Sequence, residues 1–234
     1  VPVVVAAIAA VGAVPSSVSN RIAQVFGIRG MNMTVDAACA SSFVAIDVAC
    51  NALMAGDANI AIAGGVDLGT NPPIYVGFCR VDGLSTQGMS NPFDDTADGL
   101  VIGEGVGMVV LKRLEDAIAN GDNIRSVIRG IGSSSDGAGQ AIYAPSAKGR
   151  SEALHNALNH AEMEHSKVQF IEAHATSTIV GDANEYDAIS MVYGKGRKNP
   201  KPLQLGSVKQ QIGHLKAAAG VAGLLKAVLA MEKA

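Results

Sequence analysis

Cys39 is the residue whose surroundings in the sequence most strongly suggest chemistry. It lies in VDAACASSFVAIDVA, residues 35–49, where an extended pattern gives way to a helical one. A helix N-terminus carries partial positive charge and unpaired N–H groups that would stabilise a thiolate, and the small neighbours Ala38 and Ala40 would leave the sulfur accessible. Free cysteine is also a common small core residue. The local pattern therefore indicates a nucleophile without excluding a structural cysteine.

The other two cysteines lack this setting. Cys50 lies eleven positions further along the same predicted helix, about 16 Å away and too far for a disulfide bond. Its apolar neighbours favour core packing, and Cys79 in GFCRVDG has no comparable surroundings. Three cysteines in 234 residues, an odd number, indicate a reducing compartment, and we expect the cytoplasm.

Two of the five histidines are candidates for the same chemistry. His174 in EAHATST and His214 in GSVKQQIGH each end a predicted strand, and such ends are where catalytic groups gather in α/β sheets. Lys209 lies five residues before His214, and Glu185 follows His174 in GDANE. Such groups can activate a thiol, polarise a carbonyl and hold an anion. Separations of 135 and 40 residues mean that only the fold can bring the cysteine and the two histidines together.

Two other patterns carry less weight. The remaining histidines are spaced by fives around one amphipathic pattern, lack metal-ligand spacing and are predicted to lie on the surface: His155, His160 and His165. GEGVG, residues 103–107, looks like part of a phosphate loop. It precedes a predicted strand, whereas a dinucleotide-binding fingerprint follows one, so we expect a tight turn.

The elements that must position these residues alternate between strand and helix. Strands are predicted at 59–67, 107–114, 124–136, 168–176 and 202–208, and helices from about Pro15 to 27 (capped by Ser16 or Ser17), 41–55, 148–163, 182–194 and 217–234. An exposed loop is predicted at 194–202. This alternation favours an α/β fold with mainly parallel pairing.

Composition excludes some functions. The chain has 18 basic and 21 acidic residues, a net charge of −3 and no long charge runs, so we expect neither nucleic acid nor an anionic membrane as a partner. The apolar start, VPVVVAAIAAVGAV, is too short to span a membrane and follows no basic residues. Both termini lie in apolar patterns, so we expect a piece of a larger domain.

Three motifs, in order, carry a resemblance to a known family. DAACASS around Cys39 resembles DTACSSS, EAHATST around His174 resembles EAHGTGT, and GSVKQQIGH around Lys209 and His214 resembles GSVKSNIGH. These are motifs of the β-ketoacyl synthase (ketosynthase) domain of fatty acid and polyketide synthases, and the resemblance covers nearly the whole chain. It implies a thiolase-like α/β fold of α-β-α-β-α layers with two similar halves, both incomplete here. The halves would be residues 1–136, with the nucleophile, and 137–234, with both histidines.

The resemblance also implies a mechanism. Cys39 would accept an acyl chain from a carrier-protein thioester and condense it with a decarboxylated malonyl-type extender. His174 and His214 would stabilise the thioester oxygen and the enolate, supported by Lys209 and Glu185. Phosphopantetheine of acyl carrier protein would deliver the substrates to a site holding no metal or bound cofactor, with Thr176 and Thr178 binding that arm. Further implied partners are a second copy in a homodimer, through residues 31–37, and neighbouring synthase domains.

The sequence departs from the family motifs at four small residues. Alanine replaces threonine and serine at Ala37 and Ala40, and Ala175 and Ser177 replace the glycines of HGTGT. The segment GIGSSSDGAGQAIYAPSAKG favours iterative type I synthases, such as those making polyunsaturated fatty acids or enediynes. Three alternatives stay open: a chain-length-factor partner, which would lack the cysteine; a single-His, single-Asn condensing enzyme; and a fragment inactive in isolation.

Overall fold

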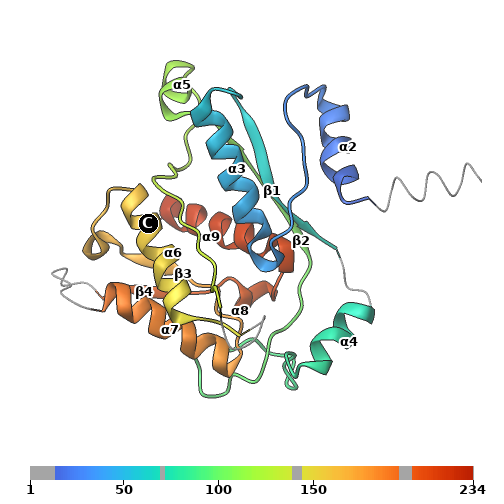
Figure 1. Ribbon diagram of the computed structural model, residues 1–234, viewed down its shortest axis with the longest axis vertical. Helices are drawn as coiled ribbons and strands as arrows, with labels where there is room; N and C mark the ends of the chain where they lie inside the picture. The colour runs from blue at the N-terminus through green and yellow to red at the C-terminus, as the bar shows by residue number, and fades with distance from the viewer. Residues whose placement is uncertain (1–13, 69–71, 139–143, 195–201, 234) are drawn as a thin grey trace, which may run out of the picture.

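The computed structural model describes residues 14–68, 72–138, 144–194 and 202–233. Figure 1 shows short strands surrounded by helices. In the part that it describes, the helices are α2 (Ser16–Phe26), α3 (Ser41–Ala55), α4 (Pro72–Arg80), α5 (Leu114–Ala119), α6 (Ala147–His160), α7 (Ile179–Tyr193), α8 (Lys209–Ile212) and α9 (Ala219–Lys233). The strands are β1 (Ala61–Asp67), β2 (Gly105–Leu111), β3 (Phe170–Glu172) and β4 (Gln204–Gly206), and 3-10 turns cover Ala38–Ala40, His165–Lys167 and Lys216–Ala218.

The first strand pair carries the start of the site. β1 and β2 are antiparallel, with Ala61 opposite Leu111 and Asp67 opposite Gly105. Helices α3 and α9 pack against these strands and against each other. Close approach requires glycine here, because a Cβ atom at Gly107 would lie 2.8 Å from Cγ1 of Val221 in α9. The prediction of mainly parallel pairing is wrong for this pair.

The second strand pair is parallel, as predicted. β3 pairs with β4 from Phe170 opposite Gln204 to Glu172 opposite Gly206. α7 packs against α6. Its buried side chains form a core with residues of α6, of β3 and of the segments just before β3 and β4: Ile189, Val192 and Tyr193 with Leu154, Leu158, Val168, Ile171 and Leu203. This core fixes the position at which β3 ends and the His174 loop begins.

Several local predictions differ from the structure. Residues 124–136 form no assigned strand, and α4 and α5 were not predicted. α2 begins after Pro15 without a side-chain cap. GEGVG is no tight turn, because Gly105 and Gly107 belong to β2. The predicted loop 194–202 and the first thirteen residues lie almost wholly outside the described residues.

The stretch Ala38–Ala55 is apolar enough to be noted as a candidate membrane span, with a mean hydropathy of 1.6 over 18 residues. In the structure this helix packs against β1 and α9. Ser42 in its first turn is fully buried, and its hydroxyl accepts the N–H of Val221 in α9 at 3.0 Å. These contacts are those of a core helix.

Candidate active site

Cys39 lies at the centre of the 3-10 turn that leads into α3. Ala38 before it has φ +50°, a left-handed conformation that a non-glycine residue adopts at a cost. The Ser41 hydroxyl fixes the turn by donating to the Ala38 carbonyl at 2.7 Å and accepting the Ala37 N–H at 2.9 Å. The chain therefore holds the cysteine in a strained, well-braced turn.

The structure brings Cys39, His174 and His214 together, as the sequence predicts. The cysteine sulfur and one ring nitrogen of each histidine all lie within 4.8 Å of one another. The two imidazole rings meet edge to face, with centroids 5.4 Å apart and an interplanar angle of 89°. Three groups from loops far apart in the chain therefore face one small volume.

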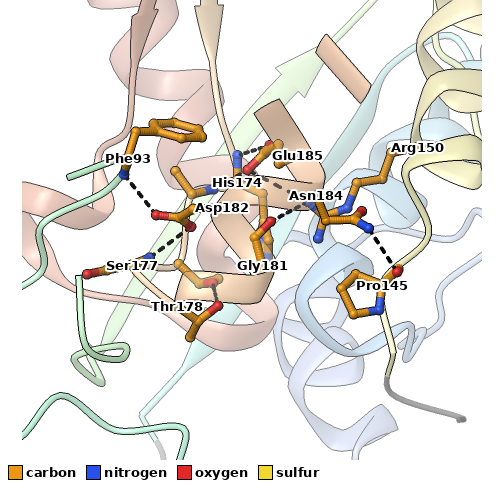
Figure 2. Close-up of polar contacts among 12 residues, drawn as sticks. Phe93, Pro145, Arg150, His174, Ser177, Thr178, Gly181, Asp182, Asn184 and Glu185 are labelled. Atoms are coloured by element: carbon orange, nitrogen blue, oxygen red, sulfur yellow. Dashed lines mark hydrogen bonds and ion pairs between the residues drawn. The ribbon is translucent and has the colours of Figure 1, made fainter. Parts of the chain in front are cut away.

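The His174 loop follows β3 and is held by α7. Glu185 in α7 accepts the N–H of His174 at 2.8 Å and that of Ala175 at 2.6 Å, one with each carboxylate oxygen (Figure 2). Arg150 of α6 lies 4.0 Å from Glu185 and donates to the carbonyl of Gly181 at 3.0 Å. Glu185 thus positions the main chain of His174, and Arg150 is a site neighbour that the sequence did not indicate.

His214 follows α8 and not a strand, and its loop docks onto the segment before β2. Its N–H donates to the carbonyl of Val101 at 2.7 Å, and its carbonyl accepts the N–H of Gly103 at 3.0 Å. The Lys216 N–H donates to Nδ1 of the His214 ring at 2.9 Å. A neutral imidazole that accepts at Nδ1 carries its proton on Nε2. His214 is therefore set up as a hydrogen-bond donor toward the site.

Both histidines are neutral near physiological pH. Burial lowers the pKa of His174 to about 3, with further lowering by Lys209, His214 and Arg150. Burial also lowers the pKa of His214 to about 4, assisted by the nearby Lys209 and Lys216. Desolvation opposes the charged imidazolium, and the neighbouring cations repel it.

Lys209 is the buried cation of the site, with 5% of its surface exposed. Burial lowers its pKa, and the carboxylate of Glu185 is the largest opposing influence. Burial likewise raises the pKa of Cys39, opposed mainly by Lys209. Desolvation therefore outweighs the effect of the helix N-terminus, contrary to the expectation of a thiolate. The resting group is a thiol, which must lose its proton on acylation.

Thr176 and Thr178 lie beside one another at the start of α7. Their hydroxyl oxygens are 2.9 Å apart, so one donates to the other (Figure 2). A Cβ atom at Gly181 would lie 2.3 Å from Oγ1 of Thr178, so this glycine makes room for the pair. Their role in binding a phosphopantetheine arm stays a prediction.

Asp182 and Ser177 join the His174 loop to the distant 91–99 loop, and the sequence did not single out these contacts. Asp182 accepts the N–H of Phe93 at 2.9 Å and that of Ser177 at 3.1 Å (Figure 2). The Ser177 hydroxyl accepts the N–H of Asn91 at 2.9 Å. The sequence signal that could have indicated these contacts is Asp182 itself, an acidic residue in GDANE three positions before Glu185.

The same three groups have the number and spacing of a metal site, but their chemistry does not suit a cation. Cys39, His174 and His214 could each offer one ligand atom. The proton on Nε2 of His214, fixed by the Lys216 N–H, blocks that nitrogen as a ligand. The buried Lys209 would also repel a metal ion. The donor set fits hydrogen bonding to an oxygen atom better than coordination.

Comparisons with known proteins identify the family of the chain. The family model "Beta-ketoacyl synthase, N-terminal domain" matches residues 3–117, and "Beta-ketoacyl synthase, C-terminal domain" matches residues 125–234. A phenolphthiocerol/phthiocerol polyketide synthase protein of Mycobacterium tuberculosis is 44% identical over 221 residues, which cover 94% of this chain and 12% of that protein. Polyketide synthase GfsA of Streptomyces halstedii is 43% identical over 223 residues, or 95% of this chain and 3% of that one.

Solved structures extend the comparison to the fold. The ketosynthase from module 6 of the bacillaene synthase of Bacillus subtilis 168 has a TM-score of 0.90 and 37% identity, covering 95% of this chain and 40% of that chain. The oxazolomycin ketosynthase domain OzmH KS7 of Streptomyces albus has a TM-score of 0.88 and 34% identity, covering 92% and 37%. The chain belongs to the β-ketoacyl synthase family and has its thiolase-like α/β fold. It spans a small part of the curated relatives and about two fifths of the solved ketosynthase chains.

Proposed function

We propose that the chain carries the condensing site of a polyketide synthase. Cys39 accepts an acyl group from the phosphopantetheine thioester of an acyl carrier protein, and the thioester condenses with a malonyl-type extender that loses CO2. The observation that carries this proposal is the meeting of Cys39, His174 and His214 within 4.8 Å. A thiol between two neutral imidazoles suits acyl transfer and stabilisation of a developing oxyanion.

The two histidines have different proposed roles. His214, with its proton on Nε2, donates to the thioester oxygen and to the enolate left by decarboxylation. His174, also neutral, stabilises that oxygen as well, and the Cys39 proton leaves with the departing phosphopantetheine thiol. Burial keeps both imidazoles neutral, and Lys209 assists by lowering their pKa values further. Lys209 also opposes the rise in the pKa of Cys39, so it favours the thiolate as it forms.

Further parts of the proposal rest on family membership and the motifs. Thr176 and Thr178 bind the phosphopantetheine arm, and the site uses no bound cofactor. Acyl carrier protein, neighbouring synthase domains and a second copy of the domain are the proposed partners, in the cytoplasm. Three further points stay predictions: the division into halves 1–136 and 137–234, a fatty acid as the alternative product, and an iterative mode of synthesis.

Mass spectrometry of the full-length protein tests the nucleophile. After incubation with an acyl-pantetheine thioester, the wild type is expected to carry the acyl group on the peptide with Cys39, and Cys39→Ala to carry none. Cys50→Ala is the matched control, because Cys50 lies further along the same helix and keeps wild-type loading. An adduct elsewhere that persists in Cys39→Ala would overturn the proposal.

Condensation kinetics test the histidine pair. His174→Ala and His214→Ala each remove a group facing the thioester, so we expect turnover to fall by about 10²- to 10⁴-fold. His155→Ala, on the exposed side of α6, is the control and keeps wild-type turnover. Equal turnover in the wild type and either site variant would remove that histidine from the mechanism.

A further inference from the structure

Lys216 lies two residues after His214, and its side chain reaches into the other half of the domain. Its Nζ is 3.0 Å from Oδ1 of Asp67, at the end of β1, and donates to the carbonyl of Gly103 at 3.0 Å. The two paired side chains are mostly buried, with 12% and 16% of their surfaces exposed. An ion pair this buried carries a large penalty when one partner is lost.

The main chain of Lys216 is strained and makes a contact that matters at the site. Its φ is +48°, in the left-handed region where a residue with a Cβ atom pays about 1 kcal/mol or more. In this conformation its N–H donates to Nδ1 of His214 at 2.9 Å. The surrounding contacts must therefore hold the Lys216 backbone in this left-handed conformation.

The GEGVG segment is the surface on which this loop rests. A Cβ atom at Gly103 would lie 2.3 Å from the carbonyl oxygen of Ile212, and one at Gly105 would lie 2.6 Å from Cδ2 of Leu215. The motif that resembles a phosphate loop thus lets the His214 loop approach closely. It also leaves the Gly103 carbonyl exposed to the Lys216 side chain.

We propose that the Lys216 side chain is a positioning element for His214. Its bonds to Asp67 and Gly103 hold residue 216 in the left-handed conformation, and this keeps the Lys216 N–H on Nδ1 and the ring proton on Nε2. The inference rests on the proposed function, in which His214 donates from Nε2. Lys216 acts through His214 and contacts no substrate.

Charged groups around His214 make the proposal measurable by pH. Burial lowers the pKa of His214 most, Lys209 and Lys216 lower it further and Asp67 raises it. Cys39 and His174 lie within 4.8 Å of the ring. Removing the Lys216 charge therefore raises the pKa of His214. The acid limb of the rate profile then moves to higher pH, which a loss of folded protein alone would not cause.

The test is condensation kinetics of the full-length protein over a pH series. We expect Lys216→Met to lower kcat on the order of tenfold, as small misplacements of catalytic groups do, with KM for the acyl thioester little changed and the acid limb shifted upward. Lys216→Arg keeps the charge, so kcat and the position of the acid limb should stay close to those of the wild type. Asp67→Asn with Lys216→Gly should recover part of kcat, because glycine adopts positive φ without strain and keeps the N–H.

Controls separate this inference from the proposed function. Lys148→Met, in the exposed Lys148 and Glu152 pair of α6, should match the wild type. Wild-type kcat and an unshifted acid limb in Lys216→Met would overturn the positioning role while leaving the proposed function intact. Wild-type turnover in His214→Ala would overturn the proposed function itself, and the role of Lys216 with it.

Discussion

The two histidine loops reach the same small volume but are held by opposite means. The His174 loop is held through its main chain by carboxylates, since Glu185 accepts two of its N–H groups and Asp182 accepts a third. The His214 loop is held by backbone pairing with residues 101–103, and its ring is fixed by an N–H. That N–H belongs to Lys216, whose side chain pairs with Asp67.

This difference gives two identical side chains different chemistry. A backbone N–H on Nδ1 limits neutral His214 to donating from Nε2. Glu185 holds His174 through main-chain N–H groups, so this contact sets the position of the loop and not the ring proton. The sequence shows that both residues are histidines, whereas the contacts of their loops determine the chemical role of each side chain.

The largest expected effect concerns pH, because both pKa values are lowered far from the ordinary 6.5. The unfolded chain then binds more protons than the folded one between about 6.5 and the folded values, so stability falls as pH falls through this window. The slope is up to about 1.4 kcal/mol per pH unit for the buried His214 and smaller for His174, which is more exposed to solvent. His214 stops contributing near pH 4 and His174 near pH 3.

Pulse proteolysis of this domain in urea, within the full-length protein, measures that slope. His214→Gln should remove more of the pH dependence between pH 5 and 7 than His174→Gln, because His214 is the more buried of the two. His155→Gln serves as the control. If both variants retained the wild-type slope, the histidines would not be buried in the neutral form.

The second-largest expected effect is a loss of stability that concerns the His174 loop and not the His214 loop. Glu185→Ala leaves the N–H groups of His174 and Ala175 without their acceptor, so we expect a loss of about 2–3 kcal/mol in the free energy of unfolding. It also removes the charge that raises the pKa of Lys209. The same proteolysis measures the loss, with Glu152→Ala on the exposed face of α6 as the control. A change below about 0.5 kcal/mol would show that Glu185 does not hold the loop.

The smallest effect concerns the two residues that replace motif glycines. Ala175 and Ser177 have φ of +33° and +65°. Ala175→Gly relieves strain and should stabilise the domain by about 1 kcal/mol. Ser177→Gly should gain less or lose stability, because it also removes the hydroxyl that accepts the Asn91 N–H. A larger gain at Ser177 than at Ala175 would mean that this bond contributes nothing.

The sequence predicted the meeting of Cys39, His174 and His214 better than the path of the chain. The start of α3 just after Cys39 and the helical runs of α6, α7 and α9 follow from local periodicity. The parallel pairing of β3 with β4 agrees with the predicted fold class. The antiparallel pairing of β1 with β2 is a contact between segments about 40 residues apart, which no local pattern encodes. The glycines of GEGVG were misassigned for the same reason, since their need for space comes from the His214 loop.

The sequence by itself determined which groups are available: one cysteine at a helix start, two histidines, a lysine and a glutamate in three recognisable motifs. Only the tertiary structure decided their states. Burial lowers both histidine pKa values and raises that of Cys39, and the contacts of Lys216 fix where the His214 proton lies. Desolvation and hydrogen bonding depend on neighbours that are distant in sequence, so these properties appear only when the chain is folded.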